Sequence, residues 1–393
     1  MQSTHLLPVL DDLSDETREA LLSDRTLRSL ADVFATIPDP RSRHGTRYDL
    51  PMLLTCLVAA LLCGCNTTEA VGAWCRYERR VLRRLFGPRT HLTPSGSLYR
   101  WLLPQLDAAH LEWALSGWIL TTRKLRDHEP VALDGKVVCG TGQAGAKGLQ
   151  LLSVSTHQTG ETLIQLPIAA KMHEIPAAQA LLPWLLLDGR VITADALHCQ
   201  TAFAHAALDG GADYLLCVKG NQQTLARDIL DLFADPTTVC TSATTVDRQH
   251  GRREERTARA STELNTHIRG FPAVGQVLEI TRTVTDKWGS HTDVDYFITS
   301  LTPRQAAPRR LLALVRGHWS IETRHYVRDV VFGEDRSQIR TGAAPHIFAA
   351  LRNAILTLLR RSGRSAITAA RRELAAHPAR ALRLVHRRFP ARR

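Results

Sequence analysis

The sequence has no apolar run long enough to cross a bilayer. Its most hydrophobic stretch, residues 50–65, is shorter than the ~20 residues that a transmembrane helix needs, and Pro51 and Thr55 interrupt it. Residues 1–23 are acidic and mixed, unlike the basic and apolar start of a secretory signal. We therefore expect a cytoplasmic protein without a membrane partner, and we interpret residues 50–65 as a core helix.

The sequence also lacks paired cysteines. None of its eight cysteines forms a C-x-x-C pair, and the chain of 393 residues is long enough to fold without cross-links. Reduced thiols of a cytosolic protein fit this pattern best. Cys63, Cys65 and Cys75 lie in an apolar helical run, so we interpret them as buried small residues rather than as metal ligands.

Negative charge is scarce in the last quarter of the chain. Residues 301–393 contain 20 Arg, no Lys and five acids, a balance of +15, whereas the whole chain carries +12 and residues 1–300 therefore carry −3. Such a cationic segment favours a polyanionic partner, most simply nucleic acid, although a solubilising surface is the alternative. A composition of 44% hydrophobic and 22% charged residues excludes a disordered chain.

Apolar periodicity divides the chain into parts. Up to about residue 125 the pattern is helical, and residues 130–235 then alternate between strands and helices, which predicts a mixed α/β sheet. The predicted strands lie at 131–133, 149–156, 161–170, 191–194 and 214–218, and the helices between or after them at 176–187, 199–208 and 222–233. Strand patterns without helices, at 254–261, 277–285 and 294–300, predict an all-β insertion over about 240–300. Helices resume at 308–318.

Three acids stand out by position. Asp134 ends the first predicted strand, Asp195 ends a later one, and Glu322 lies in a helical segment. Each has an ordinary explanation taken singly: a turn, a helix cap and a solvated helix face. If the two aspartates lie on neighbouring strands and a helix crossing that edge adds the glutamate, the three carboxylates would repel one another. A bound divalent cation would relieve this repulsion, and hard oxygen ligands suit Mg²⁺ or Mn²⁺. Two such ions about 4 Å apart suit in-line phosphoryl transfer.

Several motifs occur in an order known from one family. The chain resembles the DDE-type transposases of bacterial insertion sequences, in particular the H-repeat-associated branch. The motifs that carry the resemblance are Ile-Pro-Asp-Pro-Arg at 37–41, Ala-Leu-Asp-Gly-Lys at 132–136, Thr-Ala-Asp-Ala-Leu-His at 193–198, Tyr-Leu-Leu-Cys-Val-Lys-Gly-Asn-Gln at 214–222, His-Trp-Ser-Ile-Glu at 318–322, Arg-Asp-Val at 328–330 and Gly-Glu-Asp at 333–335.

The resemblance implies a ribonuclease-H-like catalytic core interrupted by the β-rich insertion. It divides the chain into a helical N-terminal domain at 1–125 that could bind DNA ends, a catalytic domain at 126–365, and a basic helical tail at 366–393. It also implies that Asp134, Asp195 and Glu322 are the catalytic, metal-binding triad, holding two Mg²⁺ or Mn²⁺ ions.

The surroundings of Glu322 depart from the family pattern. Related transposases often have Tyr and Arg seven and four residues before the glutamate and Lys seven after it, where this chain has Val315, His318 and Asp329. Arg316, Arg324 or Arg328 could supply the missing cations. Glu334 is a weaker alternative for the third acid.

The resemblance implies a nucleoid-associated enzyme that hydrolyses a phosphodiester at each element end and joins the end to target DNA. Its partners would be terminal inverted repeats and target DNA, bound by a homodimer. A related metal-dependent nuclease and an inactive DNA-binding relict are the alternatives. The candidate DNA-contacting residues are Lys219, Asn221, Arg316, His318, Arg324, Arg328, Arg360 and Arg361.

Overall fold

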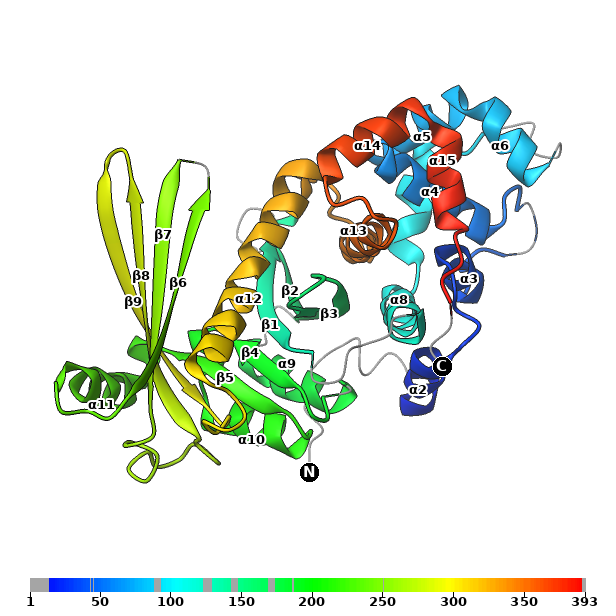
Figure 1. The fold of residues 1–393 in the computed structure, drawn as a ribbon. Coiled ribbons are helices and arrows are strands. Elements are labelled where there is room, and N and C mark those ends of the chain that lie inside the picture. The colour runs from blue at the N-terminus through cyan, green and yellow to red at the C-terminus, as the bar shows by residue number, and fades with distance from the viewer. Residues whose placement is uncertain are drawn as a thin grey trace.

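The structure, a computed structural model, describes residues 14–42, 44, 46–87, 93–122, 129–142, 148–168, 174–185, 187–249 and 251–390, except the side chains of Glu322 and Arg324. These segments form a nine-stranded sheet flanked by many helices (Figure 1). The mixed α/β class expected from the sequence is therefore confirmed. All eight cysteines are free thiols.

The N-terminal part is helical. It contains α2 (Asp15–Ser23), α3 (Leu30–Thr36), α4 (Leu50–Leu62), α5 (Thr68–Tyr77), α6 (Arg79–Phe86), α7 (Gly96–Leu102) and α8 (Ala108–Thr122). Ser29 and Asp32 form a reciprocal capping box that starts α3, and Ile37 ends it in an extended conformation because Pro38 follows. The predicted core helix is α4, which is buried at every position but Pro51.

Five strands make up one half of the sheet. They are β1 (Val131–Val138), β2 (Leu149–Thr156), β3 (Thr162–Ile168), β4 (Val191–Ala194) and β5 (Asp213–Val218), in the spatial order β3-β2-β1-β4-β5. Strands β1, β4 and β5 are parallel, and β2 pairs antiparallel with both β1 and β3. The helices α9 (Glu174–Leu181), α10 (Thr201–Asp209) and α11 (Gln223–Ala234) connect or follow these strands, as the sequence predicted.

The predicted β-rich insertion has one strand more than expected. It consists of β6 (Thr241–Gln249), β7 (Arg252–Ser261), β8 (Gln276–Asp286) and β9 (Gly289–Thr299). Strand β6 has no buried residue, so its apolar pattern is too weak to reveal it. Because β9 pairs antiparallel with β5, the insertion extends the same sheet instead of forming a separate one.

A long helix, α12 (Pro308–Tyr326), crosses the sheet (Figure 1). Its N-terminal half packs Leu311, Leu312 and Val315 into a core with Leu215 of β5 and Leu278 of β8. Its later turns contact β1 and β4. The helix therefore runs from the insertion to the strands that carry the two aspartates, and a π-helical turn at Val327–Val331 follows it.

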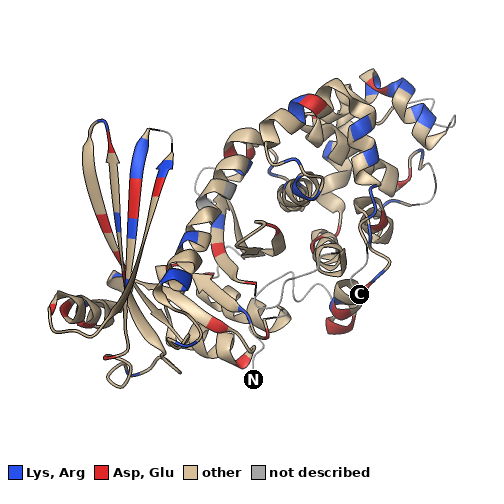
Figure 2. Ribbon diagram, in the orientation of Figure 1, with Lys and Arg blue, Asp and Glu red and all other residues tan. Residues whose placement is uncertain are grey.

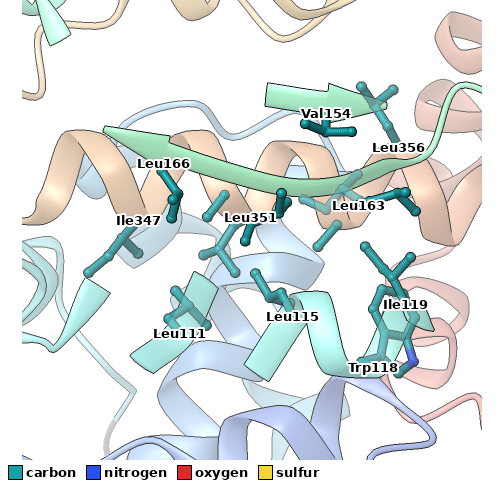
Figure 3. Close-up of a cluster of buried hydrophobic side chains, with 14 of the residues drawn as sticks. Leu111, Leu115, Trp118, Ile119, Val154, Leu163, Leu166, Ile347, Leu351 and Leu356 are labelled. Carbon is teal, nitrogen blue, oxygen red and sulfur yellow. The ribbon is translucent and has the colours of Figure 1, made fainter. Parts of the chain in front are cut away.

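The C-terminal helices pack back onto the N-terminal ones. They are α13 (Ala344–Arg361), α14 (Ile367–Ala376) and α15 (Pro378–Val385). Figure 3 shows Ile347, Leu351 and Leu356 of α13 in one apolar cluster with side chains of α8, β2 and β3. Helix α15 lies against α4, and the Phe389 amide donates to the Arg28 carbonyl over 2.8 Å. The described part of the predicted tail is thus integrated into the fold.

Candidate active site

Asp134 and Asp195 occupy equivalent positions on neighbouring parallel strands. The last paired residues of β1 and β4 are Leu133 and Ala194, and each aspartate comes directly after one of them. Strand β1 continues to Val138 by pairing with β2, so Asp134 lies within the strand and not at its end as predicted. Asp195 directly follows β4 and accepts a hydrogen bond from the Leu197 amide over 3.0 Å. The carboxyl ends of the parallel strands therefore bring both acids to one place.

The two carboxyl groups interact electrostatically. Burial raises the pKa of Asp134 to about 7, and the negative charges of Asp195 and Glu174 contribute to the rise. The Asp134 side chain retains 21% exposure, so the site is open to a small solute. Asp134 holds its proton near neutral pH and lies beside two other carboxylates, so this part of the protein has surplus negative charge. A bound cation would relieve it.

A partly buried acid–histidine pair adjoins Asp134, and neither residue has a role predicted from the sequence. Glu174 begins α9, and its Oε1 lies 2.9 Å from Nε2 of the fully buried His198. A Cβ atom at Gly135 would lie 2.3 Å from the same Glu174 oxygen, so only glycine leaves room for this carboxylate. The signal for His198 was its place in the motif at 193–198, whereas nothing in the sequence singled out Glu174.

Histidines from α12 reach both aspartate-bearing strands. His325 Nε2 lies 3.2 Å from the Asp134 carboxylate, and His318 Nδ1 lies 3.1 Å from the hydroxyl of Thr193 on β4. The Thr193 hydroxyl also contacts Nε2 of His157 over 2.8 Å. Glu322 lies on α12, four residues after His318 and three before His325, and its side chain is outside the described part of the structure. Its position in the helix is thus flanked by contacts to β4 and β1.

Lys136 anchors a second cluster of charges, one strand position beyond Gly135. Its Nζ pairs with Asp329 and lies 3.6 Å from Glu334 Oε2. Glu334 is fully buried and also pairs with Arg328 over 2.8 Å and Arg352 over 3.4 Å. Although burial alone would raise the pKa of Glu334, the two guanidinium groups hold it below its usual range.

This second cluster contains two acids that the sequence analysis discussed, Glu334 and Asp329. Glu334, the alternative third acid, is enclosed by cations and has no face open to a metal ion. Asp329, which stands where relatives often have lysine, contacts a lysine supplied by β1. A lysine is therefore present beside position 329, but it is Lys136 of β1 and not a residue of the helical segment itself.

Several predicted DNA-contacting residues have internal partners. Arg328 is 3% exposed and Arg361, which pairs with Glu161 over 2.8 Å, has a side chain only 10% exposed, so both side chains are held mainly by internal partners. Arg360 is partly buried and donates to the Gly160 carbonyl, and Arg316 pairs with Asp247 over 2.7 Å.

Other candidates lie nearer the aspartates. Lys219 follows β5, has a side chain 61% exposed and lies 3.4 Å from Asp295. The Asn221 amide donates to the Ala196 carbonyl over 2.5 Å, next to Asp195. His318 is held by Thr193 as described above, and the side chain of Arg324 lies outside the described residues.

The donor atoms at this site suit hard divalent cations, provided that a third donor joins the two aspartates. Among the side chains that the structure describes, no three His, Cys, Asp or Glu residues converge as a ready metal-binding group. The carboxylates of Asp134 and Asp195 supply two hard oxygen donors in a region of surplus negative charge. Glu322 of α12 is the third donor that the sequence predicts. Within the described residues, no helix combines the length and apolar composition needed to span a bilayer.

Comparisons with known proteins give one consistent result. Residues 125–358 match the family model described as Transposase DDE domain, and residues 31–119 match the model of the domain associated with it. The chain is 28% identical over 349 residues to the putative transposase YncI of Escherichia coli O157:H7, covering 85% of this chain and 88% of that protein.

Two further similarities were found. The H repeat-associated putative transposase YhhI of Escherichia coli strain K12 is 23% identical over 348 residues, 85% of this chain and 90% of that one. A piggyBac transposase synaptic complex with hairpin DNA aligns with a TM-score of 0.46 and 10% identity, over 94% of this chain and 80% of that chain. Because the match to the DDE-domain model covers more than half of the sequence, the chain belongs to the DDE transposase family, in the branch of the H-repeat-associated proteins and YncI.

Proposed function

We propose that Asp134, Asp195 and Glu322 are the catalytic acids of this insertion-sequence transposase. The observation that carries the proposal is the adjacency of Asp134 and Asp195 on β1 and β4, together with the raised pKa of Asp134. The position of Glu322 supports its membership. Residues three and four apart lie on one side of a helix, so Glu322 shares a side of α12 with His318, which contacts β4, and His325, which contacts β1.

We further propose that residues 126–365 form a ribonuclease-H-like catalytic unit. The order β3-β2-β1-β4-β5, with three parallel strands and an antiparallel hairpin at one edge, supports this assignment. The insertion β6–β9 lies between α11 and α12, before the glutamate, as the family resemblance led us to expect.

The DDE family generally uses divalent metal ions, and we propose two Mg²⁺ or Mn²⁺ ions held by the three acids. When bound, such a pair stabilises the attacking and leaving oxygens of an in-line phosphoryl transfer. The chain's own residues fix the geometry of the ligands. Backbone pairing holds Asp134, the Leu197 amide orients Asp195, and the Glu174–His198 pair supports β1 from the side of Gly135.

The proposed reaction has two steps. In the first, water attacks phosphorus at each element end and the bond from phosphorus to the 3′ oxygen breaks, leaving a 3′-hydroxyl and a 5′-phosphate. In the second, that hydroxyl attacks a target phosphodiester, forms the joining bond and displaces a 3′ oxygen of the target. Two ends must be held together, so we propose a homodimer on terminal inverted repeats and target DNA, acting at the nucleoid in the cytoplasm.

The test separates chemistry from binding. Asp134→Asn, Asp195→Asn and Glu322→Gln each remove a metal ligand with little change of shape, so each should abolish cleavage of element-end DNA while DNA affinity persists. The matched control is Asp228→Asn on the exposed face of α11, which should cleave as the wild type does. Equal loss of binding and cleavage in the three variants would instead indicate a structural role for these acids.

A second substrate distinguishes the alternatives. A duplex with a pre-cut element end, supplying the 3′-hydroxyl, should be joined to target DNA by the wild-type protein. Cleavage without joining would identify a nuclease, and binding without either reaction would identify an inactive relict.

A further inference from the structure

The N-terminal part carries a cluster of exposed arginines that the sequence analysis did not single out. It lies at the end of α5 and along α6 and consists of Arg76, Arg79, Arg80, Arg83 and Arg84, all exposed. Figure 2 shows this concentration of basic residues on α6, at the end of the molecule away from the β insertion. We refer to these five residues as the α6 arginine cluster.

The cluster has little internal compensation. Within residues 76–86 the only acid is Glu78, and none of the five arginines forms an ion pair with an acid in the part of the chain that the structure describes. The nearby Glu69 is already paired with Arg100 of α7. In α6, Arg79 precedes Arg83 by four residues and Arg80 precedes Arg84 by four, so like charges face one another along the helix and repel. A polyanion would remove this repulsion.

Packing explains why the arginines point outward. Leu82 is 1% exposed and anchors α6 to the core, while Val81 and Phe86 pack partly against it. The arginines occupy all the remaining positions but that of Leu85, which is 44% exposed, and Tyr77, just before the helix, is 85% exposed. The helix thus presents guanidinium groups on the side opposite its apolar anchor, with an aromatic ring beside them.

The contrast with the C-terminal quarter strengthens the case. There, Arg352 is 1% exposed and pairs with Glu334, Arg371 is 8% exposed and donates to the Leu61 carbonyl, and Arg361 is held by Glu161. Some of the arginines that give that quarter its +15 balance are therefore buried and paired inside the protein. The five arginines of the α6 cluster, in contrast, are all exposed and have no acidic partner among the described residues.

We propose that the α6 arginine cluster binds the phosphate backbone of the DNA that the transposase acts on. The proposal rests on the assignment of DNA as the substrate and adds the surface that holds it outside the active site. Guanidinium groups suit this role because their fork of donors matches phosphate oxygens. Contacts to phosphates carry no sequence information, so the cluster would hold element ends and unrelated duplexes alike.

The test is a salt titration of duplex DNA binding. The first variant replaces Arg79, Arg80, Arg83 and Arg84 by Gln, which preserves helix propensity. Each phosphate contact contributes about 0.9 to the slope of log affinity against log salt, so the slope should fall by up to about 3.6. A second variant with Lys at the same four positions keeps the charge and should keep most of the slope.

The matched control removes the same number of charges from exposed positions elsewhere, by replacing Arg269, Arg304, Arg309 and Arg310 with Gln. Its slope should stay near that of the wild type. Circular dichroism and thermal unfolding check the fold, and without DNA the α6 Gln variant should be at least as stable as the wild type because repulsion is relieved. An unchanged slope in a folded α6 variant, or an equal fall in the control, overturns the proposal. Cleavage by the wild-type protein is measured in parallel, so the proposed function stands or fails separately.

Discussion

Replacing Asp134 by Asn should make the metal-free protein more stable at neutral pH while abolishing cleavage. Burial, with the neighbouring carboxylates of Asp195 and Glu174, raises the pKa of Asp134 from about 3.8 to about 7. The charged form is therefore unfavourable in the folded protein, and Asn removes the charge while keeping the shape.

The magnitude follows from the linkage between protonation and folding. The folded carboxyl keeps its proton up to about pH 7, whereas the unfolded one loses it near pH 3.8, so the contribution of Asp134 to stability falls as the pH rises between these values. A difference of about three pKa units at about 1.4 kcal/mol each gives at most about 4 kcal/mol. The variant should therefore match the wild type near pH 4 and exceed its unfolding free energy above pH 7.

The assay is urea unfolding followed by tryptophan fluorescence, in chelator, at pH values from 4 to 8. Asp228→Asn on the surface of α11 is the control and should show no such pH-dependent gain. Added Mg²⁺ should stabilise the wild type more than the variant, since an ion bound only by the folded state adds to its stability. A variant that is equally stable or less stable than the wild type at pH 8 would refute the reasoning.

Three further outcomes are expected. Arg361→Ala should destabilise the protein by up to about 3–5 kcal/mol in chemical denaturation, because it removes the guanidinium that pairs with the buried Glu161 carboxylate, and Glu161→Gln in the same background should recover part of the loss. Gly135→Ala should displace the Glu174 carboxylate and lower the cleavage rate with little change in melting temperature; normal cleavage would show that the contact does not position the site. Chelation should stop cleavage but spare DNA retention in a gel-shift assay, and cleavage should return with Mg²⁺ or Mn²⁺; cleavage that persists in chelator would rule out the proposed cofactor.

Local sequence was sufficient to predict most helices and strands. The apolar run at 50–65 became the buried helix α4, and Pro38, readable in the sequence as a helix breaker, follows the end of α3. The exposed strand β6 was missed because it has no buried face. Periodicity reports burial, so it detects elements only where one side of them is buried.

The two aspartates could be named from the sequence because each follows a buried strand, a pattern that depends on neighbouring residues alone. Which side chains surround them was decided by the tertiary structure. Glu174 and His325 come from different helices and meet Asp134 only because the sheet and α12 bring them there.

The same distinction between local sequence and tertiary structure applies to the charged residues. Composition fixed the number of cations, and the sequence alone placed their excess in the last quarter of the chain. Only folding decided that Arg361 would be held by Glu161 inside the protein while Arg79 and Arg83 stayed open to solvent. The physical reason is that an ion pair depends on distance in space, and residues 161 and 361 are brought together by packing that no local pattern encodes.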